Sequence, residues 1–330
     1  MLIDIYGYRA HIQSSCACAI ESLAEDFAFF QSTEESGAHI IELLDEEPPY
    51  SEMPPLTANV YTPRNVSYRD GCKTYVDYSG RALGIHDRSN GNFRLYSKDP
   101  DMLYEAAYLF LLSQCGAAFD ARHLHRVHAL GVSLEGRAAL VLLPMGGGKS
   151  TLGSELLKFP DIELLSDDSP LIDRNGMIHA FPLRLGLLPD AAGAVPKDHL
   201  RRINRMEFGP KLLVNYKYFS DRVRATAEPG VLFLGRRSLA NMCEITPASG
   251  VTALHAMTAN CIVGMGLFQG MEFIFQQGGW ELTSKAAVAY SRFAASLRLI
   301  RRSRVCHLSL GRDRTENARV VHEFLRSLRR

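Results

Sequence analysis

The residues best suited to chemistry lie in one short stretch near the middle of the chain. An aliphatic run at 140–143 leads into small and polar residues: Pro144, Met145, Gly146, Gly147, Gly148, Lys149, Ser150 and Thr151. Glycines let backbone N–H groups curl around phosphate oxygens, and the N-terminus of a following helix adds a favourable dipole. The stretch therefore predicts a nucleotide-phosphate loop, in which Lys149 reaches the β- and γ-phosphates and Ser150 binds Mg²⁺.

A second aliphatic run, at 162–165, ends in Ser166, Asp167 and Asp168. Adjacent residues at the end of an extended strand point to opposite sides. One carboxylate would then hold the metal, and the other would act as general base toward an acceptor hydroxyl. The residues themselves leave open which aspartate does which.

The loop departs from the pattern G-x-x-x-x-G-K-S/T at Leu143, where the pattern has glycine. The alternative interpretation is a glycine-rich turn before a helix, with Lys149 as a solvated lysine. The preceding strand, the following helix and the aspartate pair favour the nucleotide site. We expect Lys149 to be exposed rather than packed, and Thr151 to cap the start of the helix.

The length suggests a soluble protein with two domains, or one large domain with an appended smaller one. The 330 residues are 46% hydrophobic, and 37 Lys and Arg residues nearly balance 36 Asp and Glu residues. This balance gives no electrostatic footprint for nucleic acid or membrane. We find no apolar run of membrane-spanning length and no secretion signal, so a cytoplasmic location is expected. The seven cysteines are scattered, and the closest pair, Cys16 and Cys18, lacks the spacing of a structural zinc site.

We predict an α/β fold with a boundary near residue 120. Residues 1–120 would form a smaller β-rich α+β domain with a β-meander at 60–96, where Gly71, Gly80 and Gly91 mark turns, and a helix at 103–119 that closes near Gly116. Residues 121–330 would form the P-loop domain. Its expected elements are a hairpin through Gly136, a helix at 150–158, strands at 162–165, 231–234 and 306–310, a hairpin at 171–178, and helices at 284–299 and after Asp313. The closely spaced hairpins indicate a mixed sheet.

The region 128–240 resembles the HPr kinase/phosphorylase superfamily, whose catalytic domain is also similar to ATP-dependent phosphoenolpyruvate carboxykinases. His128, the hairpin through Gly136, the loop 146–150 and the pair Asp167 and Asp168 recur in that order. The stretches 166–172 and 181–184 look especially like HPr-kinase-like enzymes of peptide-modifying gene clusters, which include kinases of lasso-peptide precursors.

This resemblance implies ATP and Mg²⁺ as cofactors, with Ser150 and Asp167 on the metal. It implies an essential role for Asp168, a supporting role for Asp167, and a His128 that contacts the transferring phosphoryl group or positions the base. Thr151 stands where bacterial HPr kinases carry glutamate, and the C-terminal signature tied to their phosphorylase activity and hexamer contacts has no counterpart here. We therefore expect kinase activity only, on another acceptor than HPr, and a possible homo-oligomer.

The leading hypothesis is an ATP-dependent kinase acting on a serine hydroxyl of a peptide or protein. The alternatives are a small-molecule hydroxyl kinase and a non-catalytic nucleotide- or peptide-binding module. Arg184 and Lys211 are candidate second cations for the phosphates. No sequence feature separates Arg224, Arg236 and Arg237 from one another. The arginines at 298–304 are expected to form a solvated helix face or, alternatively, a dock for an acidic peptide.

Overall fold

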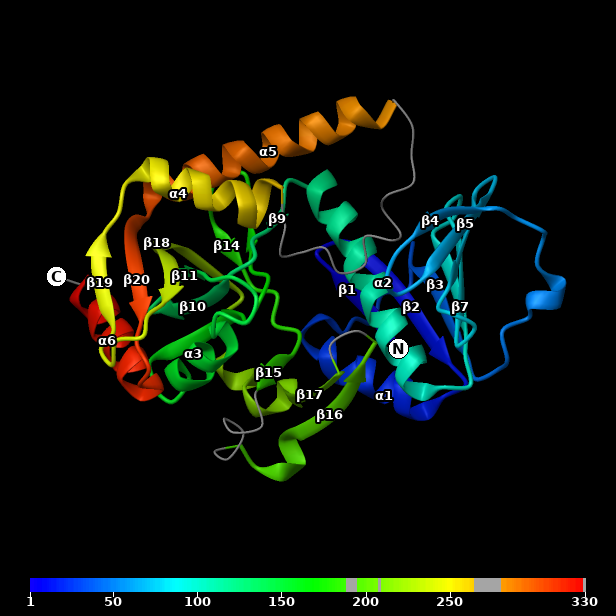
Figure 1. The fold of residues 1–330 in the computed structure, drawn as a ribbon, viewed down its shortest axis with the longest axis horizontal. Coiled ribbons are helices and arrows are strands. Elements are labelled where there is room, and N and C mark those ends of the chain that lie inside the picture. The colour runs from blue at the N-terminus through cyan, green and yellow to red at the C-terminus, as the bar shows by residue number, and fades with distance from the viewer. Residues whose placement is uncertain (188–194, 207–208, 264–279, 329–330) are drawn as a thin grey trace. The chain divides into compact units, whose positions relative to one another are not determined.

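The computed structural model describes residues 1–187, 195–206, 209–263 and 280–328, and these form a mixed α/β protein with mixed sheets (Figure 1). The chain divides into two compact units. The first comprises Met1–Phe119, Arg202–Lys211 and Gln269–Leu282, and the second comprises Asp120–Arg201, Leu212–Phe268 and Thr283–Arg330. The sequence predicts neither of the two later segments of the first unit.

The first unit is built on a mixed eight-stranded sheet with the strand order β1-β2-β3-β8-β7-β6-β5-β4. Its strands are β1 (Leu2–Ile5), β2 (Tyr8–Ser14), β3 (His39–Leu44), β4 (Ala58–Tyr61), β5 (Val66–Asp70), β6 (Lys73–Asp77), β7 (Leu83–Asp87) and β8 (Asn92–Tyr96). The antiparallel run from β4 to β8 confirms the predicted meander. β2 and β3 are parallel, and α1 (Ala17–Asp26) connects them, because parallel neighbours require a crossover.

Helix α2 (Pro100–Ala121) provides the apolar cover of this sheet. Phe110 of the helix stacks on Phe93 of β8, with ring centroids 3.8 Å apart. The helix has the length and mean hydropathy of a membrane span, contrary to the sequence-based expectation, but 83% of its apolar window is buried inside the protein. Gly116 is buried within the helix, so the predicted end near that residue is wrong.

The second unit contains a nine-stranded sheet with the path β12-β10-β11-β18-β14-β13-β9, in which β20 pairs with β18 and β19 pairs with β20. Its strands are β9 (His125–Arg126), β10 (Leu130–Leu134), β11 (Arg137–Leu142), β12 (Ile162–Ser166), β13 (Leu171–Ile172), β14 (Ile178–His179), β18 (Thr226–Arg237), β19 (Glu244–Pro247) and β20 (Arg304–Leu310). β11, β18 and β20 are parallel, and the flanking pairs are antiparallel. A smaller sheet orders β15 (Leu185–Leu187), β17 (Gly209–Val214) and β16 (Leu200–Arg205) as β15-β17-β16.

Helices cover both faces of the nine-stranded sheet (Figure 1). Alternate residues of a strand face opposite sides. Accordingly, Val141 and Leu143 share a core with α3 (Lys149–Leu156) and α6 (Arg314–Ser327). Leu140 and Leu142 share a second core with α4 (Gly250–Met257) and α5 (Trp280–Arg302). The sheet therefore separates two apolar cores.

The last helix confirms a capping signal in the sequence. Asp313 is the N-cap of α6, and its Oδ1 accepts a hydrogen bond of 3.0 Å from the backbone N–H of Glu316. A capping carboxylate satisfies one of the donors left unpaired at a helix start. The apolar periodicity of the sequence predicts a buried face of Ala318, Val321, Leu325 and Leu328; the first three are buried, and Leu328, the C-cap, is only partly buried.

The segments whose residues could take part in a reaction lie together at one edge of the nine-stranded sheet. β11 and β18 are parallel, so the loops that follow Leu142 and Arg237 leave the sheet at the same edge. β12 runs antiparallel to β10, which runs antiparallel to β11, so the end of β12 before Asp167 lies at that edge too. Ligands of open α/β sheets bind outside the carboxyl ends of the strands. The glycine loop and the aspartate pair therefore meet where such a ligand would lie.

Leu143, the departure from the P-loop pattern, is a core residue of this edge and is 1% exposed. It packs directly over Gly235 of β18. A Cβ atom at Gly235 would lie 2.7 Å from Cγ and Cδ2 of Leu143 and 2.8 Å from the carbonyl oxygen of Leu142. The glycine on β18 thus makes room for the leucine that replaces a loop glycine.

We expect Gly235→Ala to lower the free energy of unfolding by about 1–3 kcal/mol, because the new methyl group has no space. Gly250→Ala is the matched control. Its Cβ would meet only Cγ2 of Ile300, at 3.7 Å, at the start of α4, and the exchange should be neutral or stabilising by about 0.5–1 kcal/mol. Denaturant unfolding of both variants and of Gly235→Ala with Leu143→Ala measures the coupling. Strict additivity of the double variant would contradict the packing argument.

Candidate active site

All three glycines of the loop are required by its backbone. Gly146 and Gly148 have φ angles of +73° and +98°, which side-chain-bearing residues rarely adopt. A Cβ at Gly147 would lie 2.8 Å from the carbonyl oxygen of Pro144, to which the N–H of Gly147 donates a hydrogen bond of 2.9 Å. Positive-φ glycines next to a helix start form the kind of concavity that binds anions.

Helix α3 begins directly after the loop, and its N-cap is Gly148. Thr151 lies inside the first turn, where its carbonyl oxygen accepts a hydrogen bond from Oγ of Ser154. The prediction that Thr151 caps the helix is therefore wrong. A left-handed glycine at the N-cap lets the chain pass from loop to helix without a side-chain cap.

Lys149 is buried, contrary to the expectation of an exposed lysine. Its Nζ donates to Nε2 of His128 at 2.8 Å, to the carbonyl oxygen of Leu143 at 2.8 Å and to that of Pro144 at 3.4 Å. Burial lowers the pKa of Lys149, and the nearby carboxylates of Asp168 and Asp167 oppose that shift. The ammonium is held in the loop by satisfied hydrogen bonds, as a buried charge requires.

Ser150 and Asp167 form a direct pair. Oγ of Ser150 donates to Oδ2 of Asp167 at 2.8 Å, and the N–H of Gly186 lies 3.4 Å from the same oxygen. Asp167 is buried. A hydroxyl and a carboxylate at this separation are hard oxygen donors of the kind that Mg²⁺ prefers. The residues predicted to bind the metal are therefore adjacent in space.

Asp168 points to the other side of the strand end, and 54% of its side chain is exposed. Its Oδ1 lies 3.8 Å from Nζ of Lys149 and 3.3 Å from Nδ1 of His128, at which distance the hydrogen bond is not well formed. Because Nε2 of His128 accepts from an ammonium, the neutral ring carries its proton on Nδ1. Asp168, His128 and Lys149 are thus in mutual contact, with the carboxylate on the solvent side.

Arg237 is a residue of the site that the sequence did not single out. It is the last residue of β18, and its Nη1 lies 3.7 Å from the position that a Cβ of Gly148 would occupy. Among the described residues, the side chain of Arg237 is exposed and makes no hydrogen bond or ion pair. Arg236 points elsewhere, because its Nε donates to Oγ of Ser309 at 2.9 Å. The sequence did not show that β11 and β18 pair in parallel, and this pairing brings Arg237 close to the glycine loop.

The other two predicted cations have different positions. Arg184 is half-buried and directly precedes β15, the strand whose Gly186 faces Asp167. Lys211 lies on β17, in the part of that strand assigned to the first unit. A phosphate-binding role for either residue stays a prediction.

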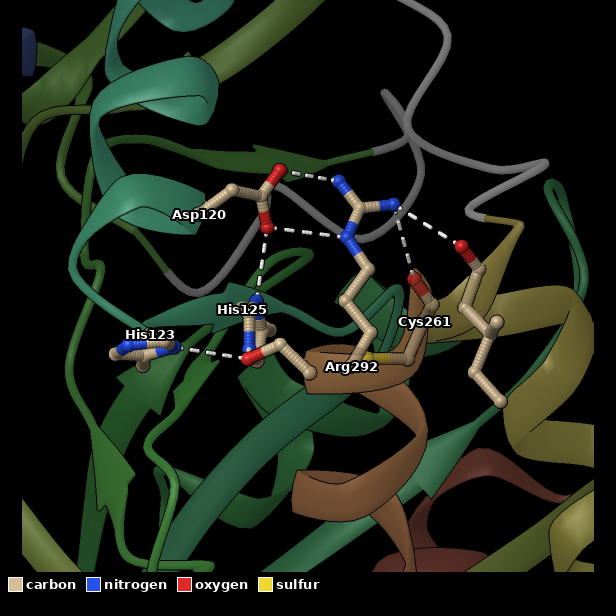
Figure 2. Close-up of polar contacts among 7 residues, drawn as sticks. Asp120, His123, His125, Cys261 and Arg292 are labelled. Carbon is tan, nitrogen blue, oxygen red and sulfur yellow. Dashed lines mark hydrogen bonds and ion pairs between the residues drawn. The ribbon is translucent and has the colours of Figure 1, made fainter. Parts of the chain in front are cut away.

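A polar network connects Asp120, His125 and Arg292 (Figure 2). Asp120 accepts from Nε and Nη2 of Arg292 at 3.0 and 2.6 Å, and its Oδ1 is also 2.8 Å from Nδ1 of His125. Nε2 of His125 lies 2.9 Å from Oγ of Ser291, which is 3.0 Å from Nδ1 of His123. The network ties α5 to the chain segment that leads into β9.

The Asp120–His125–Ser291 order is that of a hydrolytic triad, but the environment of these residues indicates a structural role. His125 is completely buried, so its ring cannot reach a leaving group. Ser291 lies in the middle of α5, where backbone N–H groups are used within the helix and offer no oxyanion hole.

This network instead holds His128 from two directions. Nη1 of Arg292 donates to the carbonyl oxygens of Cys261 and Ile262 at 3.3 and 3.1 Å. The neighbouring carbonyl of Asn260, in the same π-helical turn Thr258–Ile262, accepts a hydrogen bond of 2.8 Å from the N–H of His128. On the other side, His125 lies on the short strand β9 that leads to His128.

No protein-family model matches this chain, and no curated protein matches it. One edge of the sheet brings together the left-handed glycines of the loop, the Ser150–Asp167 pair and the exposed carboxylate of Asp168.

We expect Asp120→Asn to lower the free energy of unfolding by about 2–4 kcal/mol, because it leaves the guanidinium of Arg292 partly buried without its counter-charge. Burial alone would raise the pKa of Asp120, but hydrogen bonds from His125 and Arg292 outweigh burial and lower it. The stability contributed by this carboxylate is thus present above its ordinary pKa of 3.8 and lost as the pH falls through the lowered value.

Denaturant unfolding between pH 3 and 7 measures both effects. Glu155→Gln is the control, since its ion pair with Lys158 is on the surface and should change stability by less than about 1 kcal/mol. An Asp120→Asn variant as stable as the wild type at neutral pH would show that the network does not anchor α5.

Proposed function

We propose that this protein is an ATP-dependent kinase, similar to HPr kinases, that transfers the γ-phosphate to a serine hydroxyl of a peptide or protein. The observation that carries the proposal is the 2.8 Å hydrogen bond between Ser150 and Asp167 at the end of the glycine loop. In a P-loop enzyme, the loop hydroxyl and an acidic residue at a neighbouring strand end hold the same metal ion. A glycine-rich turn that binds no metal does not require a hydroxyl and a carboxylate in contact at its end.

The residues of the loop fit a nucleotide triphosphate with Mg²⁺. The left-handed glycines allow backbone N–H groups to face phosphate oxygens, and Lys149 supplies a positive charge at the same place. When bound between Ser150 and Asp167, Mg²⁺ would neutralise charge on the phosphates. For Lys149 to contact phosphate, its ammonium exchanges the carbonyl oxygens of Leu143 and Pro144 for phosphate oxygens.

Asp168 is the group we assign to the acceptor. It is exposed, and it lies next to Lys149 rather than within the Ser150–Asp167 pair. As general base, its carboxylate takes the proton of the serine hydroxyl while the hydroxyl oxygen bonds to phosphorus and ADP leaves. His128 contacts both Lys149 and Asp168 and thereby positions the base relative to the phosphate-binding lysine.

Two features support a peptide or protein as acceptor. The candidate base is open to solvent, so a serine near a chain terminus can approach it. The stretches 166–172 and 181–184 resemble the kinases of peptide-modifying gene clusters.

The test is phosphate transfer from ATP and Mg²⁺ to a serine-containing peptide, measured by the mass of the peptide. We expect Asp168→Asn to lower kcat by about 100- to 10,000-fold with ATP binding retained, because only the base is lost. Asp167→Asn should weaken the response to Mg²⁺ and lower the rate less. Calorimetry with ATP separates binding from transfer.

Several results would reject parts of the proposal. Near-wild-type turnover in both variants would remove the aspartates from the mechanism. Transfer only to free amino acids or sugars would make the protein a small-molecule kinase. Absence of ATP binding at millimolar concentration would exclude a nucleotide site altogether. Lys149→Ala is a poor control here, because the buried ammonium also satisfies three hydrogen-bond acceptors of the loop.

We also expect Arg237→Gln to lower kcat by about 100-fold, because a guanidinium beside Gly148 stabilises the charge that develops on the transferred phosphoryl group. Arg236→Gln is the matched control on the same strand, and its side chain is engaged with Ser309. The same peptide assay measures both variants. Equal loss in the two variants would assign the effect to overall charge and not to the position of Arg237.

A further inference from the structure

The first unit carries a pair of thiols whose proximity the sequence does not reveal. Sγ of Cys16 lies 3.2 Å from Sγ of Cys18 at the start of α1. The other five cysteines are single thiols, of which Cys72 is exposed and the rest are buried: Cys115, Cys243, Cys261 and Cys306. The structure describes all seven as reduced.

The two thiols have different access to solvent. Cys18 is exposed, and Cys16 is buried with 7% of its surface accessible. Oγ of Ser14 accepts from the N–H of Cys16 and donates to its carbonyl oxygen, both at 3.0 Å, which fixes the backbone of Cys16 before the helix. An external reagent therefore meets Cys18 first, and Cys16 stands behind it as the nearest nucleophile.

The sulfur separation distinguishes disulfide formation from metal binding. Two thiolates on one tetrahedral Zn²⁺ lie about 3.8 Å apart, given Zn–S bonds of about 2.3 Å. The thiols here are closer than that, and the described residues contain no group of three or more potential metal ligands. A disulfide needs an S–S bond of about 2.05 Å, so an approach of roughly 1.2 Å completes it.

We propose that Cys16 and Cys18 are a thiol–disulfide exchange site that reacts with low-molecular-weight disulfides of the glutathione type. The Cys18 thiolate attacks one sulfur of the small disulfide, forms a mixed disulfide and releases one thiol. The Cys16 thiol then loses its proton and attacks the Cys18 sulfur, which releases the second thiol and closes the Cys16–Cys18 bond. One small disulfide is reduced to two thiols, and the protein dithiol loses two hydrogen atoms.

The environment of Cys18 sets the pH dependence of this exchange. The hydrogen bond to Cys16 and, to a lesser extent, burial raise the pKa of Cys18 above its ordinary value. Because the thiolate is the attacking species, exchange should be slow near neutral pH and accelerate as the pH rises. Ser14 contacts the backbone of Cys16 and carries no titrating charge in this range.

The experiment treats the full-length protein with increasing ratios of oxidised to reduced glutathione and maps each cysteine by mass spectrometry after acid quenching. We expect the peptide with Cys16 and Cys18 to lose two hydrogen atoms without keeping glutathione. Cys72 is the internal control, because a single exposed thiol forms only a mixed disulfide. The pair should oxidise at a glutathione disulfide concentration about tenfold lower than Cys72, since its second thiol is held at high effective concentration.

Two variants test the order of attack. In Cys16→Ser, the resolving thiol is missing, so a stable glutathione adduct should accumulate on Cys18. In Cys18→Ser, the buried Cys16 should stay unmodified. Cys16 is the N-cap of α1, where serine is favoured, and Cys18 is exposed, so both variants are expected to fold, as circular dichroism would verify. A lasting adduct on Cys18 in the wild type, or a pair that stays reduced where Cys72 reacts, would overturn the proposal.

Discussion

The buried ammonium of Lys149 constrains the whole sheet edge that carries the glycine loop in the second unit. A charge out of water must be satisfied by nearby acceptors, and here these are the carbonyl oxygens of Leu143 and Pro144 and the Nε2 atom of His128. This requirement fixes the path of the loop and the orientation of the His128 ring. It also places the carboxylate of Asp168 3.8 Å from the ammonium.

The loop achieves this arrangement with a sequence that departs from the general P-loop pattern. Leu143 fills a core position, and Gly235 on the neighbouring strand leaves the space it needs. The pattern has a glycine in the loop, whereas this chain has a leucine there and a glycine in contact with it on β18. The leucine at position 143 therefore leaves the other contacts of the loop in place, among them that of Ser150 with Asp167.

The sequence predicted the elements with a strong local signal and missed those that depend on distant partners. The meander, the strands around the glycine loop and the capped α6 follow from turn residues, apolar periodicity and an N-cap, all local properties. The contact between Ser150 and Asp167 agrees with the resemblance, which implied that both lie near one metal ion, whereas the residues alone left open which aspartate is the partner. The burial of Lys149 and the proximity of Arg237 to Gly148 did not, because both depend on the register of β11 with β18 and on the position of His128. The strands β1 to β3 were missed for lack of a clear periodicity before residue 45.

The site lies on the seam between the two apolar cores. Lys149 belongs to α3, whose side chains pack into one core, whereas the backbone of His128 is bonded to the turn that follows α4, beside the second core. The 2.8 Å contact between Nζ of Lys149 and Nε2 of His128 therefore spans two independently packed layers. A displacement of α5 against the sheet would pass through Arg292 to the carbonyls of Cys261 and Ile262 and change this single contact. Helix α5, on the opposite face of the sheet from α3, is thus connected through Arg292 and His128 to the lysine of the glycine loop.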